Sequence, residues 1–377
     1  MPHDRLTIVF SGMLAGVPGQ GGATWAALQY VLGLRQLGHT VYVVEPVAAA
    51  TPASRAYFRA VVRTFGLADN ATLLVSGTRA TVGLPFERLV SVARQADLLI
   101  NAAGMLTDPL LLESIPTRLY LDLDPGFTQL WDTCPGVDMR FANHTHFASV
   151  GVLLGRSDCS VPKGGRQWLP TLQPVVRACW PASPSARIRR RETFTTIAHW
   201  RSYGSIEHEG VHYGQKAHSL RALFGLPAHT GAAFELALGI DPAEVRDLAD
   251  LAAHGWRLVD PARLAGSPAR YRHYIQESWA EFGLAKSGYV AGRTGWFADR
   301  SVCYLASGRP VVAQDTGFGA VLPTGVGLFC FQTAEDVVEA YEALRSDYNR
   351  HARAAVGIAE AYFDSQRVLP QLLAALA

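Results

Sequence analysis

Short runs of β-branched and apolar residues recur along the first half of the chain, and segments of helical length separate them. A parallel strand reaches its neighbour only through a crossover of about a dozen or more residues. This spacing therefore predicts strands that pair in parallel, with helices as the crossovers. The runs that we assign to strands are Leu6–Phe10, Thr40–Val44, Thr72–Val75, Leu98–Asn101 and Leu119–Asp122.

The alternation is interrupted between about Pro162 and Glu192, where prolines, glycines, serines and the basic run RIRRR are typical of a linker. It resumes at Phe194–Ala198, Phe234–Leu238, Arg257–Val259, Tyr289–Ala291 and Pro310–Ala313. We therefore predict an α/β fold of two Rossmann-like domains that face a cleft. The predicted parts are an N-terminal domain (1–175), a linker (176–192), a C-terminal domain (193–362) and a C-terminal helix (363–377).

Composition restricts the partners that we expect. The 377 residues carry 34 basic and 32 acidic side chains, a net charge of +2, so no overall field attracts a polyanion and we predict no nucleic-acid partner. The five cysteines are odd in number and form no C-x-x-C pair, which predicts reduced thiols in a cytoplasmic protein and no metal site. We predict no cofactor. The apolar run LTIVF is too short for an integral membrane segment or a signal sequence.

Two cations follow the first predicted strand of the second domain. Arg201 lies in the loop after that strand, and Lys216 lies where a helical pattern begins. Ligands of open parallel sheets bind beyond the carboxyl ends of the strands. Fixed cations there would stabilise the negative charge that develops on a diphosphate when a bonded sugar departs. We predict that both side chains bind a diphosphate, with ordinary surface charges as the alternative.

The segment from Lys286 to Gly319 offers two further loops that each follow a predicted strand. Its second half contains a predicted helix that runs to about Ala306, with Asp299 placed to cap it. Backbone N–H groups at a helix start and in a glycine-rich loop bind phosphate oxygens. We predict donor-binding roles for Arg293, Thr294, Asp299, Arg300, Ser301, Asp315, Thr316 and Gly317.

A glycine-rich loop, SGMLAGVPGQGG, follows the first predicted strand of the chain. Gly21 and Gly22 stand just before a helical pattern, where they let backbone approach a ligand closely. Glu45 ends the next strand, as a ribose-binding acid would in a dinucleotide enzyme, but the loop lacks the G-x-G-x-x-G spacing. We predict that the two glycines line the ligand site, and a purely structural turn remains open.

The run SGRPVVAQDTG resembles the nucleotide-sugar region of GT-B glycosyltransferases, and the layout of the whole chain is similar to that of family 4. The resemblance implies a GT-B fold and a metal-independent transferase. Its donor is a nucleoside diphosphate sugar, its sugar a hexose, and its acceptor a hydroxyl-bearing small molecule or glycan. The Arg and Lys that grip the diphosphate in relatives correspond to Arg201 and Lys216. The paired glutamates of such relatives would fall at Gly295 and Cys303, so the signature is atypical.

The resemblance implies that the acceptor binds to the first domain. Asp122 and Asp124 follow the fifth predicted strand, and His144 and His146 come about twenty residues later. A histidine or carboxylate in the cleft could remove the proton of an acceptor hydroxyl. We predict His146 first, and then Asp124, as the catalytic base or acceptor ligand. The two histidines lack a third metal ligand, so we predict no metal here.

Two other functions remain open at this stage. A nucleotide-sugar 2-epimerase uses a similar two-domain fold, although it requires several acids around the sugar. A non-catalytic nucleotide-sugar binder would explain the missing glutamates. The oligomeric state is not predicted.

Overall fold

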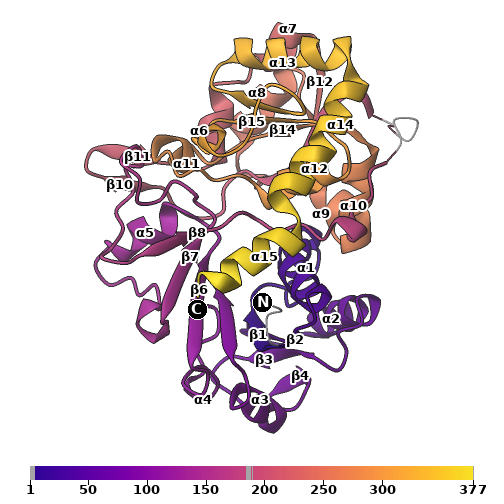
Figure 1. Ribbon diagram of the computed structural model, residues 1–377. Helices are drawn as coiled ribbons and strands as arrows, with labels where there is room; N and C mark the ends of the chain where they lie inside the picture. Colours follow the sequence, from indigo (N-terminus) through magenta and orange to yellow (C-terminus); the bar gives the residue numbers. More distant parts are fainter. Residues whose placement is uncertain (1–4, 184–187, 189, 377) are drawn as a thin grey trace.

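The computed structural model describes residues 5–183, 188 and 190–376, and Figure 1 shows its two α/β domains, one below the other. The first domain contains an eight-stranded sheet in the order β4-β3-β2-β1-β5-β6-β7-β8, in which only β4 runs antiparallel to its neighbour. Its strands are β1 (Thr7–Ser11), β2 (Thr40–Val47), β3 (Ala71–Val75), β4 (Thr81–Gly83), β5 (Leu98–Ala102), β6 (Thr117–Asp122), β7 (His146–Ser149) and β8 (Trp168–Pro170).

The second domain contains a six-stranded parallel sheet in the order β13-β12-β9-β14-β15-β16. A separate antiparallel hairpin, β10-β11, extends from this domain toward the first. These strands are β9 (Arg190–His199), β10 (Ile206–His208), β11 (Val211–Tyr213), β12 (Ala233–Gly239), β13 (Arg257–Val259), β14 (Ser278–Gly283), β15 (Val311–Gln314) and β16 (Leu328–Phe331).

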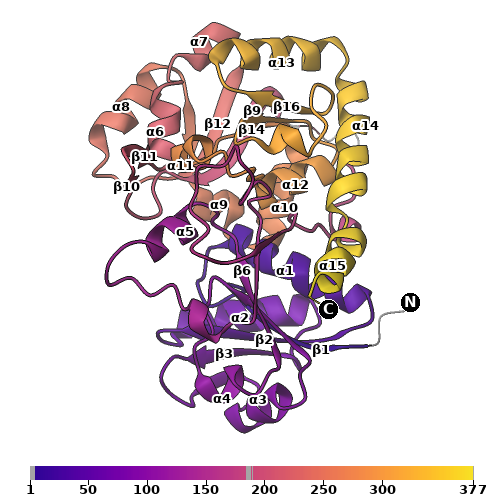
Figure 2. The ribbon, with the colours of Figure 1, turned by 60° about the vertical axis from the view of Figure 1, so that its left-hand side comes forward.

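Helices connect the strands and cover both sheets (Figure 2). In the first domain they are α1 (Gly21–Gln36), α2 (Pro52–Thr64), α3 (Phe86–Ala93), α4 (Pro109–Leu112) and α5 (Phe127–Asp132). In the second they are α6 (Lys216–Arg221), α7 (Leu226–Thr230), α8 (Val245–Ala253), α9 (Pro261–Ala265), α10 (Pro268–Glu277), α11 (Ser287–Ala291), α12 (Asp299–Ala306), α13 (Ala334–Ser346) and α14 (Tyr348–Ile358). A π-helical turn (Ala359–Phe363) leads into the last helix, α15 (Ser365–Ala374).

Most predicted strands are confirmed, but the strand predicted at Tyr289–Ala291 is wrong, because those residues belong to α11. The strand at this place is β14, which begins eleven residues earlier at Ser278 and has the sequence SWAEFG. Every residue of this strand is buried, but its Ser and Glu interrupt the run of apolar residues by which a buried strand is recognised in a sequence. The basic run of the predicted linker falls partly outside the described residues, and β9 already begins at Arg190.

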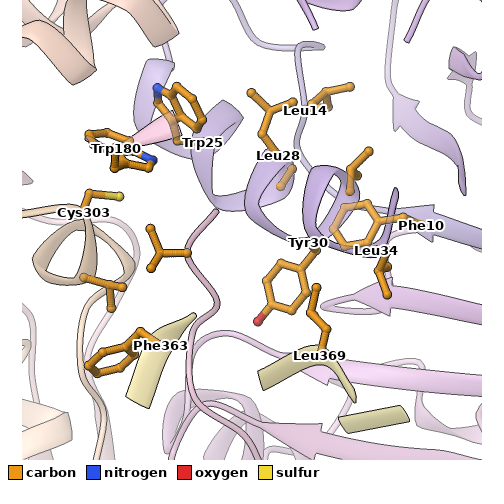
Figure 3. Packing of buried hydrophobic residues seen from close by; sticks show 14 of the residues in the cluster. Phe10, Leu14, Trp25, Leu28, Tyr30, Leu34, Trp180, Cys303, Phe363 and Leu369 are labelled. Atoms are coloured by element: carbon orange, nitrogen blue, oxygen red, sulfur yellow. The ribbon is translucent and has the colours of Figure 1, made fainter. Parts of the chain in front are cut away.

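The two domains share one hydrophobic core. Trp25 of α1 packs against Trp180 at a ring-centre distance of 4.9 Å, and its indole N–H donates to the carbonyl of Pro268 in the second domain at 2.8 Å. Figure 3 shows this cluster, with Cys303 of α12 beside the two tryptophans. Apolar side chains from both domains are therefore buried together.

The last helix returns from the second domain to the first (Figure 1). Val175 pairs with Asp364, and the Val175 amide donates to the carbonyl of Phe363 at 2.7 Å. Leu369 of α15 is fully buried and lies so close to Gly33 of α1 that a Cβ at position 33 would stand 2.6 Å from its Cδ1 atom. Helix α15 thus completes the core beneath α1.

Both sheets reverse their strand order next to a central strand. β1 pairs with β2 on one side and β5 on the other, and β9 pairs with β12 and β14 in the same way. Such switch points are where open α/β sheets bind ligands. Among the described residues, no helix is both long and apolar enough to cross a membrane.

Candidate active site

Two neighbouring cavities lie between the domains, at the carboxyl ends of both sheets. The glycine-loop cavity, of about 290 Å³, is bounded by Gly19–Ala23, the end of β9, helices α9 and α10, and the start of α12. The two-lysine cavity, of about 380 Å³, lies between the loops after β1 and β5 and the side chains of Lys216 and Lys286. Ala23 lines both cavities, so they adjoin. The predicted cleft is therefore present.

Lys216 is the first residue of α6 and points into the two-lysine cavity. Among the described residues no hydrogen bond or ion pair holds its ammonium, which lies 5.9 Å from the ring centre of Trp296. Burial, and after it the charges of Arg300 and Lys286, lowers the pKa of Lys216 to about 7. An unpaired ammonium that burial disfavours is a ready site for an anion.

Asp124 follows β6 in the first domain and faces the same cavity. Both of its carboxylate oxygens accept from Nζ of Lys286 at 2.9 Å, and each also accepts from a phenol, of Tyr203 or Tyr289. The Lys286 ammonium lies 4.3 Å from the ring centre of Tyr203 and 4.9 Å from that of Phe127. Asp124 and Lys286 thus form an ion pair that joins the domains.

The glycine loop is held by Glu45. One oxygen of this buried carboxylate accepts from the backbone N–H groups of Leu14, Ala15 and Gly16, at 3.1, 2.6 and 2.8 Å. Burial raises the pKa of Glu45, while these three bonds oppose the shift. Glu45 therefore supports the loop conformation.

Gly21 and Gly22 begin α1 and line the glycine-loop cavity, against the second domain. A Cβ at Gly21 would stand 2.3 Å from the carbonyl oxygen of Ala265, and one at Gly22 would stand 2.9 Å from the ring of Tyr271. These glycines allow the domains to approach each other. Their part in ligand binding stays a prediction.

Asp299, Arg300 and Ser301 form the first turn of α12, and the predicted end of this helix at Ala306 is confirmed. Asp299 lines the glycine-loop cavity, and burial raises the pKa of its carboxyl. The predicted cap is displaced by one residue, because Ala298 is the cap residue and Asp299 is the first residue of the helix. Arg300 donates from Nε to Glu281 at 2.5 Å and from Nη1 to the carbonyl of Ile197 at 2.7 Å, and it also lines the glycine-loop cavity.

The loops around Thr294 and Thr316 contact each other and the first domain. The Gly295 amide donates to the carbonyl of Thr316 at 2.7 Å, and the Leu153 amide donates to that of Thr294 at 3.1 Å. Arg293 is half-exposed, 3.8 Å from Asp158. Neither of these loops lines the two cavities in the described structure.

Asp315 and Gly317 follow β15 in the same region. The Asp315 carboxylate accepts from Gln332 at 2.8 Å and from the Gly317 amide at 2.7 Å. Gly317 has a φ of +93°, a conformation that favours glycine. Donor binding by this loop stays a prediction.

Arg201 lies at the protein surface in an ion pair with Glu244, with Nε 2.5 Å from the carboxylate. It does not line either cavity, whereas the next residue, Ser202, lines the two-lysine cavity. The structure therefore does not bring Arg201 and Lys216 together around one cavity.

The structure separates the two predicted catalytic residues. His146 begins β7 and pairs with Leu119, whereas Asp124 follows the opposite, carboxyl end of the neighbouring strand β6. Asp122 is fully buried and accepts from Thr128, Gln129 and Ser149.

His144, the other histidine of this segment, contacts the amide of Asn101, and burial lowers its pKa to about 4. Among the residues that the structure describes, no three His, Cys, Asp or Glu side chains gather so as to hold a metal ion.

Sequence reasoning missed Lys286, Tyr203 and Tyr289. A signal was available, because the sequence contains only three lysines among its 34 basic residues, and two of them line one cavity. Lysine differs from arginine in that burial readily shifts its pKa. The misplaced strand at Tyr289–Ala291 obscured Lys286, which lies in the loop after the true strand β14.

No protein-family model and no curated protein matches the sequence. Solved structures do match. An alpha-glucosyltransferase in complex with UDP-glucose and DNA containing an abasic site has a TM-score of 0.65 at 11% identity, covering 99% of both chains. The same enzyme with UDP and a 13-mer DNA containing a HMU base has a TM-score of 0.64 at 12% identity, again over 99% of both chains. HepE of Anabaena with UDP-glucose has a TM-score of 0.61 at 14% identity over 99% of both chains.

The prediction that excluded nucleic acid as a partner was wrong, because alpha-glucosyltransferases of this architecture are seen in complex with DNA. The net charge of +2 is a sum over the whole chain, so it does not reveal local clusters of like charge. Arg55, Arg59 and Arg63, for example, follow one another at successive turns of α2 and line one surface groove.

The likeness extends over nearly the whole length of each chain and includes both domains. At sequence identities of 11% and 14%, this likeness demonstrates the fold alone. The resemblance to family 4 stays a prediction. The predicted fold class is confirmed: the protein has the GT-B fold.

Proposed function

We propose that this protein is a glycosyltransferase that moves a hexose from a nucleoside diphosphate sugar to a hydroxyl group of an acceptor. The observation that carries the proposal is Lys216, a partly buried ammonium that no described residue pairs with, in a cavity between two domains of a GT-B fold. Such a cation stabilises the diphosphate leaving group without a proton transfer. UDP-glucose and UDP in the solved relatives support a diphosphate ligand of this kind.

The donor fits across the two adjoining cavities. We place the diphosphate beside Lys216 and the nucleoside in the glycine-loop cavity, where His199, Tyr271 and Asp299 supply aromatic and polar groups. The acceptor then enters from the side of the first domain, past Met13 and Met105. A cytoplasmic location stays a prediction, to which the five free cysteines are suited.

A thermal-shift and turnover experiment tests the proposal. UDP, GDP, TDP and ADP, each free and as a hexose conjugate, are screened, because a ligand that binds the native state raises its stability. We expect the nucleotides of one base to raise the melting temperature of the protein. We expect Lys216→Met to lower the affinity of the protein for those nucleotides by at least about tenfold. Lys163→Met is the matched control, because Lys163 is exposed and lines neither cavity.

Turnover separates the proposal from its alternatives. The donor is incubated alone and with an acceptor panel that includes sugars, small alcohols and DNA with hydroxymethylated bases. Nucleotide release that depends on an acceptor supports the transferase. A changed sugar without any acceptor would establish an epimerase, and tight binding without release across the panel would establish a non-catalytic binder.

A further inference from the structure

The carboxylate of Asp124 has no free oxygen in this structure. Each oxygen accepts one bond from Lys286 and one from a tyrosine phenol. A carboxylate bound in this way is a poor acceptor for the proton or the hydroxyl of a substrate, although it lines the cavity.

Lys286 is held by more than its ion pair. It is buried, and the rings of Phe127, Tyr203 and Tyr289 surround its ammonium at 4.9, 4.3 and 5.1 Å from their centres. Burial lowers the pKa of Lys286, and Asp124 opposes this shift. The aromatic rings would keep the ammonium in position if its counter-ion left.

The cavity therefore contains two lysines and one carboxylate that neutralises only Lys286. A diphosphate in this space carries more negative charge and more acceptor oxygens than Asp124. Arg201, the expected second cation, is paired with Glu244 outside the cavity, so Lys286 is the second cation that the cavity itself supplies.

We propose that the donor diphosphate displaces Asp124 from Lys286, and that the released carboxylate then binds the acceptor hydroxyl. The inference rests on the proposed function and adds to it a second donor-binding residue, Lys286, and an acceptor-binding residue, Asp124. It implies an order of binding in which the donor precedes the acceptor. Before the donor arrives, the ion pair with Lys286 also keeps the Asp124 carboxylate from repelling the incoming diphosphate.

Calorimetric binding of UDP tests the exchange, and inorganic pyrophosphate serves as a probe without a base. Asp124→Asn removes the competing charge and keeps the shape of the side chain. We expect this variant to bind both probes about 10- to 100-fold more tightly than the unaltered protein, and Lys286→Met to bind them at least about tenfold more weakly. Unchanged or weaker binding by folded Asp124→Asn would overturn the exchange.

Asp132→Asn provides a matched control. Asp132 also pairs with a cation, Arg166, at 2.7 Å, and lies eight residues after Asp124, but it does not line the cavity. Its substitution should leave UDP affinity within about twofold. In the double variant of Asp124→Asn and Lys286→Met, the gain from the asparagine should vanish. If Asp124→Asn still raised the affinity for UDP in the absence of Lys286, the effect would come from the lost negative charge alone, and the exchange would be overturned.

Carbodiimide labelling of the unaltered protein does not depend on the folding of any variant. Glycine ethyl ester is coupled with and without saturating UDP, and the labelled peptides are mapped by mass spectrometry. We expect UDP to accelerate labelling of Asp124 and not of Asp132, and slower labelling of Asp124 would contradict its release. If no nucleoside diphosphate binds at all, the proposed function fails. If UDP binds without these effects, only the exchange fails.

Discussion

At position 216 the chain keeps an ammonium group where burial disfavours its charge. The pKa of about 7 reflects burial together with the cations Arg300 and Lys286, which Asp124 and Asp299 oppose. A structural role would pair this group with a carboxylate, as the fold does for Lys286. The lack of a partner for Lys216 within the described part of the chain is therefore better explained by a ligand, since perturbed pKa values concentrate at functional sites.

Donor affinity should depend on pH through Lys216. A bound diphosphate raises the pKa of Lys216 above its free value of about 7, so binding takes up a proton when the pH exceeds 7. Affinity should then fall by up to about tenfold per unit as pH rises from 7 toward the pKa of the complex. Calorimetric titrations of UDP between pH 7 and 9 measure this slope, and in this range the terminal phosphate, with a pKa of about 6, is already ionised.

Lys216→Met provides the control for this pH dependence. Two other titratable groups lie near Lys216. Burial lowers the pKa of His199, so it is neutral throughout this range, and the ion pair with Asp124 opposes the effect of burial on the pKa of Lys286. The slope should therefore disappear in the methionine variant. A slope that survives the substitution would assign the proton uptake to another group.

Sequence patterns identify some individual residues of the site and miss others. Lys216 is recognisable because it follows a strong strand pattern and opens a helix. The contact between Asp124 and Lys286 joins positions 162 residues apart and depends on how the domains pack, which no local pattern encodes. The ion pairs of Arg201 and Arg300, with Glu244 and Glu281, were equally invisible for this reason.

At the scale of elements, α1 serves two purposes. Its amino end lines the glycine-loop cavity, and its glycines allow α9 and α10 of the other domain to approach. The strand–loop–helix pattern predicted this helix, with a start near Ala23, and the observed helix begins two residues earlier at Gly21. It could not show that Gly21 faces the backbone of Ala265, because that contact forms only when the second domain is in place.

Gly21→Ala should destabilise the protein and disturb the cavity. The added Cβ would stand 2.3 Å from a backbone carbonyl oxygen, which cannot move as a flexible side chain would. We expect a loss of about 1–3 kcal/mol in the free energy of unfolding, measured by urea denaturation, together with weaker UDP binding. Gly357→Ala is the control, because nothing lies within 4 Å of its added Cβ in α14 and alanine favours a helix.

At the scale of the whole molecule, one hydrophobic cluster joins the two domains. Trp25, Trp180, Cys303 and Leu369 belong to one cluster that includes residues of both sheets. The sequence predicts the two sheets separately, because each follows a local alternation. It does not predict that one core joins them, since this depends on contacts between distant segments.

Leu369→Ala should therefore destabilise both domains together. Removal of this fully buried side chain should lower the free energy of unfolding by about 2–5 kcal/mol. Calorimetry should show a single transition that shifts as a whole, with tryptophan fluorescence and far-ultraviolet circular dichroism coinciding. Two separate transitions in the unaltered protein would contradict the cooperative core.

The docking of α15 on α1 has a consequence for how the protein is made. Helix α1 leaves the ribosome before α15, although the face of α1 around Gly33 packs against Leu369 of α15. Almost the whole described chain lies between these two helices. At typical rates of synthesis this delay is on the order of tens of seconds. During that time the face of α1 that packs against α15 is uncovered, so nascent chains of this protein should depend on chaperones until α15 emerges.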